Sequence, residues 1–153
     1  MRIAVGSDEK TALTDVIVEE LKRRGHELSL VGPLAGEKKA WPAVARKVAE
    51  AVAEGRAEEG VLFCWTGTGV SLADNKVPGI RAALYDDAET ARGARLWDNA
   101  NILCLSLRRA SEAVAKEILE TWFSTSYKPN PEDDAALAEL EALEAKYRST
   151  PGK

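Results

Sequence analysis

The sequence predicts an α/β protein, built as a doubly wound three-layer sandwich around a five-stranded parallel sheet. Short apolar runs of strand length alternate with segments whose apolar residues recur at the period of a helix. Such alternation is typical of strands joined by helical crossovers, which give a parallel sheet covered on both faces. The 153 residues, 45% of them hydrophobic, are enough for one well-packed core.

The expected strands are short apolar runs bounded by turn-forming residues. The run Val-Leu-Phe-Cys-Trp at residues 61–65 contains no charged residue, as expected of a strand that is buried on both faces. The single histidine, His26, begins the second strand, and we expect a structural role for it. We place the strands at residues 2–5, 26–31, 61–65, 80–85 and 102–107.

The expected helices carry an apolar stripe and stop at glycine or proline. The first has Leu13, Ile17 and Leu21 on one face and ends at Gly25. Ser111 is a suitable N-cap for the fifth. A polar loop is expected at residues 32–39. We place the helices at residues 11–24, 41–55, 70–73, 88–96, 111–123 and 133–147.

The most informative stretch covers residues 58–81, where a glycine-rich turn, Thr66-Gly67-Thr68-Gly69, follows the third strand and opens a short helix. The glycines permit a tight turn. The free amide groups at such a turn attract phosphate or an oxyanion that forms during a reaction. Cys64 precedes the turn, where a thiolate is favoured. The pattern predicts a catalytic cysteine beside an anion hole, and the alternative is a cysteine that only fills the core.

Polar residues follow most of the other strands as well. The carboxyl ends of parallel strands meet at one edge of the sheet, and ligands bind there in doubly wound folds. We therefore expect one polar site around Cys64. Its expected members are Ser7, Asp8, Glu9, Trp41, Cys64 to Gly69, Asp86, Trp97 to Asn101 and Arg108.

Composition excludes several classes of partner. The net charge of −4 provides no basic surface for nucleic acid. No apolar run reaches the length that spans a membrane, and the chain starts directly on strand residues, so we expect neither a membrane anchor nor a signal peptide. Cys64 and Cys104 are expected to be reduced thiols of a cytoplasmic protein. With one histidine, a histidine-rich metal site is excluded.

Several motifs together resemble one family. They are Gly6-x-Asp8, Cys64-x-Thr66-Gly67-x-Gly69-x-Ser71, Asn75-Lys76-x-x-Gly79-Ile80-Arg81-Ala82, Asn99-x-Asn101-x-Leu103 and Arg108. Over residues 1–147 the chain is similar to ribose-5-phosphate isomerase type B and to the galactose-6-phosphate isomerase subunits. The segment from Cys64 to Arg81 is the most specific part of the resemblance.

The resemblance implies a flavodoxin-like, Rossmann-like sheet, a homodimer or dimer of dimers with sites shared across the interface, and aldose–ketose isomerisation without metal or organic cofactor. It implies that Cys64 moves a proton between C1 and C2 of an open-chain sugar or sugar phosphate, assisted by Thr66, while loop amides hold the enediolate oxygen. Asp8 is the third expected catalytic residue. The expected substrate-binding residues are Glu9, Trp41, Gly67, Thr68, Gly69, Trp97, Asp98, Asn99 and Arg108.

The chain departs from the family pattern where the substrate would bind. Glu9 stands where the family has histidine, and Trp97 stands where it has a histidine implicated in ring opening. An acidic stretch at residues 132–134 replaces arginines that bind phosphate from the partner subunit. Arg108 remains, with Lys128 as an alternative cation. We therefore expect ribose 5-phosphate to be a poor substrate and another sugar to be preferred.

Three tryptophans, Trp41, Trp65 and Trp97, are expected near the mouth of the site. They suit stacking on the apolar face of a sugar ring, and the alternative is that they fill an interface. Residues 1–131 are interpreted as the isomerase-like domain. Residues 132–153 form a helix and tail whose leucine stripe is expected to pack on a partner subunit.

Two other functions remain open from the sequence. One is a non-catalytic member of the family that binds a sugar or sugar phosphate. The other is a nucleotide-binding domain, because Gly67-x-Gly69 follows a strand and Asp86 ends the next one. Against the latter, the third glycine of that fingerprint is Leu72. Retention of Cys64 with the whole turn favours the isomerase.

Overall fold

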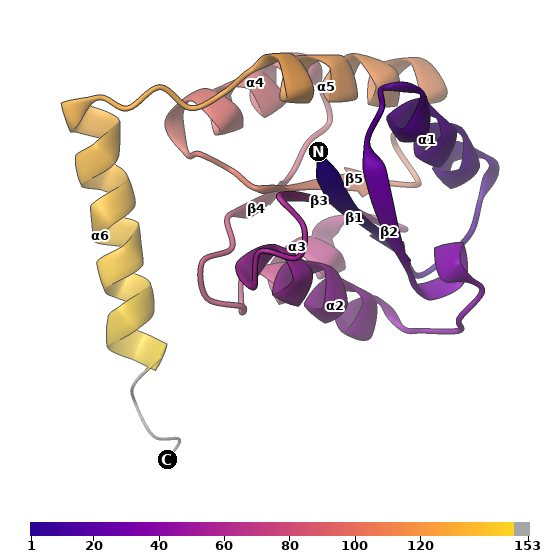
Figure 1. Cartoon of the computed structure of the whole chain (residues 1–153), viewed down its shortest axis with the longest axis horizontal. Helices are drawn as coiled ribbons and strands as arrows, with labels where there is room; N and C mark the ends of the chain where they lie inside the picture. The colour runs from indigo at the N-terminus through magenta and orange to yellow at the C-terminus, as the bar shows by residue number, and fades with distance from the viewer. Residues whose placement is uncertain (149–153) are drawn as a thin grey trace.

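The computed structural model of the chain describes residues 1–148 and contains one parallel sheet with the strand order β2-β1-β3-β5-β4 (Figure 1). The strands are β1 (Arg2–Ser7), β2 (Glu27–Val31), β3 (Glu59–Cys64), β4 (Ala82–Leu84) and β5 (Ile102–Ser106). The helices are α1 (Ala12–Arg23), α2 (Trp41–Ala53), α3 (Thr68–Asp74), α4 (Ala88–Trp97), α5 (Glu112–Ser124) and α6 (Pro131–Arg148), with a short 3-10 helix η1 (Gly32–Ala35). The expected doubly wound fold is confirmed.

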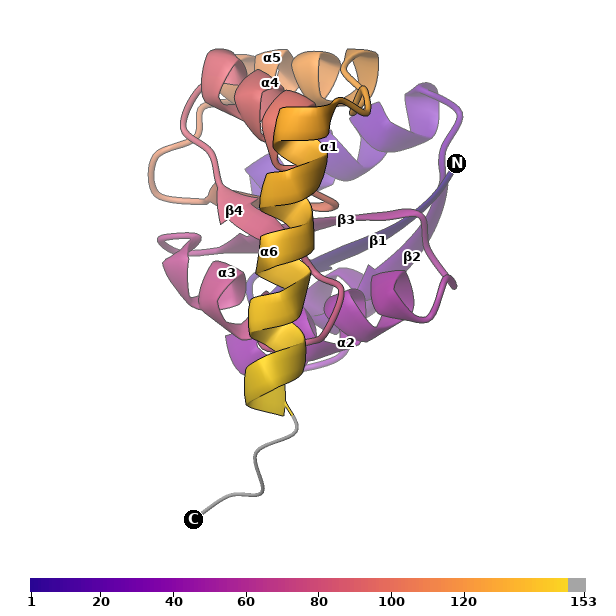
Figure 2. The same ribbon diagram turned by 90° about the vertical axis from the view of Figure 1, so that its left-hand side faces the viewer.

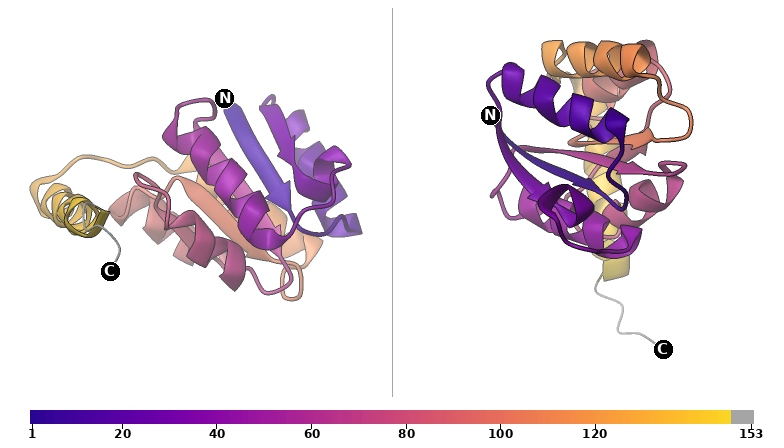
Figure 3. Two further views of the ribbon diagram at one scale, coloured as in Figure 1. Left: turned by 90° about the horizontal axis from the view of Figure 1, so that it is seen from below. Right: turned by 90° about the vertical axis from the view of Figure 1, so that its right-hand side faces the viewer.

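Helices cover both faces of the sheet. Figure 1 shows α1, α4 and α5 on one side and α2 and α3 on the other, and the view from the right-hand side in Figure 3 shows the same layers. The side chains of each strand alternate between these faces, so the interior consists of two apolar layers. Trp122 and Phe63 belong to the layer under α1, α4 and α5, and Val48 and Leu62 belong to the layer under α2 and α3.

The elements lie close to their expected positions, with shifts at several ends, and three of the differences concern local structure. The loop expected at residues 32–39 contains the short helix η1, whose first turn includes Pro33. The fourth strand is shorter than expected at both ends, and at its start the Asn75 side chain donates to the C=O of Ala82 and accepts from its N–H. Trp65 lies just beyond the end of β3 with 55% of its surface exposed, so the apolar run continues one residue past the buried strand.

The last helix stands apart from the rest of the chain. Figure 2 shows α6 passing along the edge of the sheet next to β4. No residue of α6 is buried, and Leu140 and Leu143 are about half exposed. Its contact with the body includes the Glu144 carboxylate, which accepts a hydrogen bond from the Gly79 N–H at 3.1 Å. The expectation that this helix packs on a partner stays a prediction, and residues 149–153 lie outside the described part.

Within residues 1–148, none of the helices is both long and apolar enough to cross a lipid bilayer.

Candidate active site

The ends of three neighbouring strands converge on Cys64. Cys64 is the last residue of β3 and is paired in register with Ser106, the last residue of β5. On the other side, Phe63 is paired with Ser7 at the end of β1. The turns that follow β1, β3 and β5 therefore meet at the carboxyl edge of the sheet, as the sequence predicted. Cys64 is a free thiol at this edge, and 5% of its surface is exposed.

The turn after Cys64 requires glycine at position 67. Gly67 has a φ angle of +74°, a conformation that other residues rarely adopt. A Cβ atom there would lie 2.4 Å from the Leu84 Cδ1 atom and 3.0 Å from the backbone carbon of Leu105. The turn is therefore packed closely against β4 and β5, and it leads into the start of α3, where the first amide groups of a helix lack partners within the helix.

Hydrogen bonds hold the segment around this turn. The Trp65 carbonyl accepts from the Ser106 hydroxyl at 3.0 Å and from the Arg108 N–H at 2.9 Å. The Cys64 carbonyl accepts from the Leu107 N–H at 3.0 Å. The end of β5 thus positions the backbone on both sides of the Cys64 side chain, and the geometry around Cys64 depends on both strands.

The hydroxyl groups of Thr66 and Thr68 lie 2.7 Å apart within the turn and are both exposed. Trp41, the first residue of α2, lies over the same turn. A Cβ atom on Gly69 would stand 3.1 Å from the Trp41 ring carbons Cδ2 and Cε3, so the absence of a side chain at position 69 lets the indole approach the backbone. The structure thus brings Trp41, Thr66, Gly67, Thr68 and Gly69 together with Cys64.

Asp8 and Glu9 follow β1 at the same edge. The Ser7 hydroxyl donates to the Glu9 carbonyl and accepts from the Glu9 N–H, which turns the chain sharply after the strand. The Oδ1 atom of Asp8 is buried and has no hydrogen-bond partner among the described residues. Burial, and to a lesser degree the Glu9 carboxylate, raises the pKa of Asp8. Asp8 is therefore suited to hold a proton that a substrate oxygen could take up.

Two arginines follow β5. The Arg109 guanidinium lies 3.5 Å from the Asp86 carboxylate, which places Asp86 at this edge as predicted. Arg108 is exposed, and its backbone N–H is bound to Trp65. The carboxyl edge thus carries a cation on one side and the Asp8–Glu9 carboxylates on the other.

Trp97, Asp98 and Asn99 do not lie at this edge in their own chain, which corrects the expected grouping. They end α4, which runs back from the carboxyl edge, and they lead into the start of β5 at the opposite, amino edge. Arg81 marks the same edge, because its Nε atom donates to the Asn99 carbonyl at 2.8 Å. The sequence analysis grouped these residues with Cys64 because they are polar. Polarity does not show whether a residue lies at the carboxyl edge or at the amino edge of the sheet.

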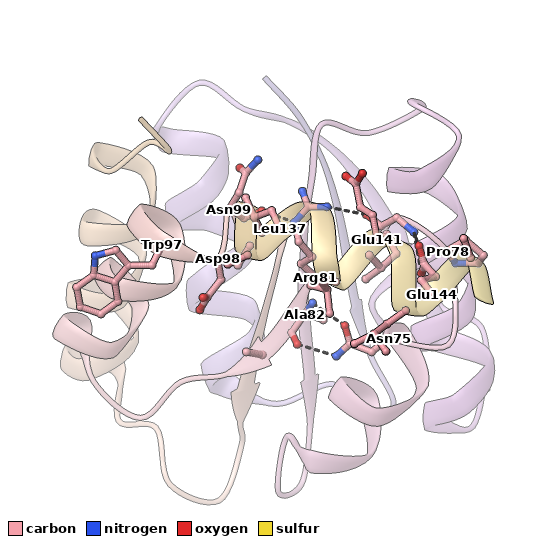
Figure 4. Close-up of a pocket in the computed structure, with 18 of the residues that line it drawn as sticks. Asn75, Pro78, Arg81, Ala82, Trp97, Asp98, Asn99, Leu137, Glu141 and Glu144 are labelled. Atoms are coloured by element: carbon pink, nitrogen blue, oxygen red, sulfur yellow. Dashed lines mark hydrogen bonds between the residues drawn. The ribbon is translucent and has the colours of Figure 1, made fainter. Parts of the chain in front are cut away.

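These three residues line a cavity of about 1140 Å³ between the body and α6. Figure 4 shows Asp98 and Asn99 near Arg81, with the Trp97 ring farther out. Asn99 has a φ angle of +45°, which is uncommon for a residue other than glycine. Burial, followed by the nearby Asp133 of α6, raises the pKa of Asp98. The cavity is therefore lined by polar residues of the body on one side and, on the α6 side, by residues that include Leu137, Leu140 and Leu143.

One buried polar group escaped the sequence-based prediction. Asp74 is the last residue of α3 and is fully buried, with its Oδ2 atom 3.5 Å from the Cys104 Sγ atom. The available signal was the helical spacing, since Asp74 lies four residues after buried Val70 and therefore on the inner face of α3.

Within residues 1–148, no cluster of three or more His, Cys, Asp or Glu side chains is arranged to hold a metal ion.

The family model described as Ribose/Galactose Isomerase matches residues 3–140. The chain belongs to this family. It is 34% identical over 94% of its length to the galactose-6-phosphate isomerase subunit LacB of Clostridium acetobutylicum, covering 83% of that protein. It is 31% identical over 97% of its length to ribose-5-P isomerase B of Listeria innocua, covering 100% of that protein. The expected family is confirmed.

Solved structures agree with this assignment. Ribose-5-phosphate isomerase B of Clostridium thermocellum superposes with a TM-score of 0.90 at 36% identity, over 96% of this chain and 99% of the other. A D-erythrulose-4-phosphate isomerase of Pectobacterium atrosepticum, 33% identical over 84% of this chain and 86% of its own, belongs to the same set of relatives. Isomerases that act on different sugar phosphates thus share this fold, and the expected enzyme class, an isomerase, is confirmed.

Proposed function

We propose that the chain is an aldose–ketose isomerase that acts on a sugar or sugar phosphate through an enediolate, with Cys64 as the base. The observation that carries the proposal is the position of Cys64, at the end of β3 and directly before a turn that only glycine permits. Family membership supports the reaction class. It also favours this function over a nucleotide-binding domain.

The proposed chemistry uses two parts of the site: the Cys64 side chain and the backbone amides of the turn that follows it. The Cys64 thiolate removes a proton from the carbon next to the carbonyl of the open-chain sugar, and the same thiol returns it to the neighbouring carbon. Between the two steps, negative charge lies on the enediolate oxygen. The backbone amides of Gly67, Thr68 and Gly69 would stabilise this oxygen, and the Thr66 hydroxyl adds a further donor.

Asp8 is the proposed acid for opening the sugar ring. Its raised pKa and its buried Oδ1 atom, which has no hydrogen-bond partner among the described residues, support this role, because a carboxyl that is protonated more readily than usual can donate its proton to the ring oxygen. Glu9 stands beside it as a hydrogen-bonding group for sugar hydroxyls. The indole of Trp41 over the turn provides a surface for the apolar face of a sugar.

The substrate is proposed to be a sugar other than ribose 5-phosphate. At the carboxyl edge Arg108 and Arg109 are both exposed, but Arg109 is paired with Asp86, and the Glu9 carboxylate adds negative charge at the same edge. One charge-assisted contact to a phosphate contributes about 1.5–3 kcal/mol. Losing two such contacts would lower efficiency on a phosphorylated sugar by roughly 10² to 10⁴.

A homodimer is part of the proposal. Trp97, Asp98 and Asn99 lie at the amino edge of their own sheet, so they can contact substrate only in the site of a second copy. The cavity between α6 and the body offers space for a segment of that copy, with Leu140 and Leu143 as exposed apolar contacts. In a dimer of dimers, each site would still be shared between two copies in the same way.

The deciding experiment is steady-state kinetics with a panel of pentoses, hexoses and their phosphates, in the native chain and in a Cys64→Ala variant. The expected result is a Cys64-dependent conversion of one aldose–ketose pair. A Cys64-dependent kcat/KM for ribose 5-phosphate above about 10⁴ M⁻¹s⁻¹, an ordinary enzyme's value, would overturn the substrate proposal. Binding of sugars without conversion would instead identify a non-catalytic member, a reading that Trp97 in place of the family's histidine also allows.

A further inference from the structure

A carboxyl group lies buried behind the catalytic turn with almost nothing to satisfy it. Asp74 has 0% of its surface exposed. Its Oδ2 atom accepts from the Cys104 Sγ atom at 3.5 Å, and its Oδ1 atom has no hydrogen-bond partner among the described residues. A thiol is a weak donor, so burying this carboxyl costs free energy that its contacts do not return. Such a group needs an explanation other than stability.

Cys104 connects Asp74 to Cys64. In the pairing of β3 with β5, Cys104 is opposite Leu62 and Ser106 is opposite Cys64. Because side chains two residues apart share a face, Cys64 and Cys104 are diagonal neighbours on the same side of the sheet, and both belong to the apolar layer under α2 and α3. Burial raises the pKa of the Cys104 thiol, and the nearby Asp74 and Cys64 raise it further.

The surroundings of this cluster contain no described cation that would offset its charge. The helix α2 presents apolar residues such as Val44 and Val48, while its charged residues Arg46, Lys47 and Glu50 are at the surface in ion pairs. The strand β4 consists of alanine and leucine. Arg81, which precedes it, is bound to the carbonyls of Asn99 and Gly79.

The α3 residues nearest to Asp74 are uncharged where they face the sheet. The Ser71 hydroxyl contacts the Cys104 thiol, and the Asn75 amide is bound to the backbone of Ala82. On the face of the sheet that packs against α2 and α3, β3 and β5 contribute the two thiols of Cys64 and Cys104. Burial therefore raises the pKa of Asp74 to about 8, which leaves the carboxyl protonated at neutral pH.

We propose that Asp74 is a positioning residue for the cysteine chemistry: its proton keeps the layer behind Cys64 uncharged, and loss of that proton to solvent opposes formation of the Cys64 thiolate. The inference rests on the proposed role of Cys64 as the base. Two anions on this face of the sheet would repel each other, so a charge on Asp74 would disfavour a second negative charge on Cys64. The upper pH limit of the enzyme's activity is thereby set by Asp74, a residue that does not contact the substrate.

The test follows Cys64 directly rather than through activity. The rate of iodoacetamide alkylation of Cys64, read from its peptide by mass spectrometry, is measured from about pH 6 to about pH 10, a range that brackets the ordinary thiol pKa. It is compared in the native chain and in Asp74→Asn. We expect the midpoint of the profile to fall by on the order of one pH unit in Asp74→Asn and the profile to become steeper. Asp15→Asn, which removes an exposed carboxyl on α1, is the matched control and should leave the profile unchanged.

Coincident profiles for the native chain and Asp74→Asn would overturn the inference. Should Asp74→Asn fail to fold, carbon-13 NMR of the Asp74 carboxyl in the native chain decides instead. A titration of that carboxyl that coincides with a second step in Cys64 alkylation supports the inference, and a carboxyl that does not titrate over the same range overturns it. The proposed function fails separately, through retained activity of Cys64→Ala, and neither alkylation nor NMR depends on that result.

Discussion

Glu59 and Arg95 form an ion pair inside the molecule, with 2.7 Å between the Glu59 Oε1 atom and the Arg95 Nη2 atom. The Trp122 indole donates to the other Glu59 oxygen, and the Arg95 guanidinium lies 4.8 Å above the Trp122 ring. Arg95 also binds the carbonyls of Ala100 and Thr125. The Arg95 side chain thus connects β3 and α5. It also holds the segment before β5, through Ala100, and the segment before α6, through Thr125.

Arg95→Leu is expected to lower the free energy of unfolding by about 3–5 kcal/mol, because it leaves the buried Glu59 carboxylate without its cation. Urea denaturation measures the loss. The control is Arg92→Leu on the same helix, whose ion pair with Glu89 is exposed and should contribute less than about 1 kcal/mol. Equal losses in the two variants would show that the buried pair does not stabilise the protein.

Gly67→Ala is expected to abolish most of the isomerase activity and to destabilise the chain. The added Cβ would collide with the Leu84 Cδ1 atom at 2.4 Å and the backbone would be strained, so the turn must move. Gly79→Ala is the matched control, because Gly79 has a φ angle of +81° but no atom within 4 Å of the added carbon. Gly79→Ala should therefore show only the conformational cost of about 1–3 kcal/mol. Full activity in Gly67→Ala would refute the role of the turn.

Cys64 is expected to react with alkylating agents and Cys104 is not. Cys64 reaches the carboxyl edge, whereas Cys104 is fully buried and burial raises the pKa of its thiol. Limited alkylation at neutral pH followed by peptide mapping distinguishes the two. Faster labelling of Cys104 would contradict the placement of Cys64 in the site.

Asp74 should make the protein less stable as the pH rises. Its pKa is about 8 in the folded chain and 3.8 in the unfolded reference, so between these values the folded state binds the extra proton. Stability from this group is therefore complete below the lower value and is lost progressively as pH rises towards the higher one. Asp74→Asn should remove this slope and raise stability near pH 8 by about 3–5 kcal/mol. Thermal unfolding across this range measures it, and parallel pH curves for both proteins would contradict the assignment.

Sedimentation velocity at micromolar concentration is expected to show at least a dimer. The exposed Leu140 and Leu143 on α6 and the cavity beside them are the proposed contact. Replacing both leucines by glutamate should shift the population towards monomer, and exchange of Glu139 for glutamine on the same helix should not. A clean monomer in the native chain would remove the shared-site proposal.

Much of the fold followed from local patterns. The apolar runs at β1, β3 and β5 are long enough to be unambiguous, and the turn at Gly67 was visible because two glycines follow a cysteine. Position across the sheet was harder to predict. Trp97 and Cys64 belong to different edges because α4 reverses the chain direction, and polarity carries no information about direction. Asp74 escaped because an aspartate in a short helix normally indicates an exposed end, whereas its burial depends on the packing of α3 against β5.

The isolation of α6 has a consequence for how the protein is made. The sheet and its five packed helices are complete once residue 124 has been synthesised, since α6 contributes no buried side chain to either apolar layer. Domains fold as units during synthesis, with the N-terminal part first. The core can therefore form while α6 is still inside the ribosome. Most of the stability of a helix in a protein comes from packing against other elements, so α6 gains most of its order when it finds a surface to pack on.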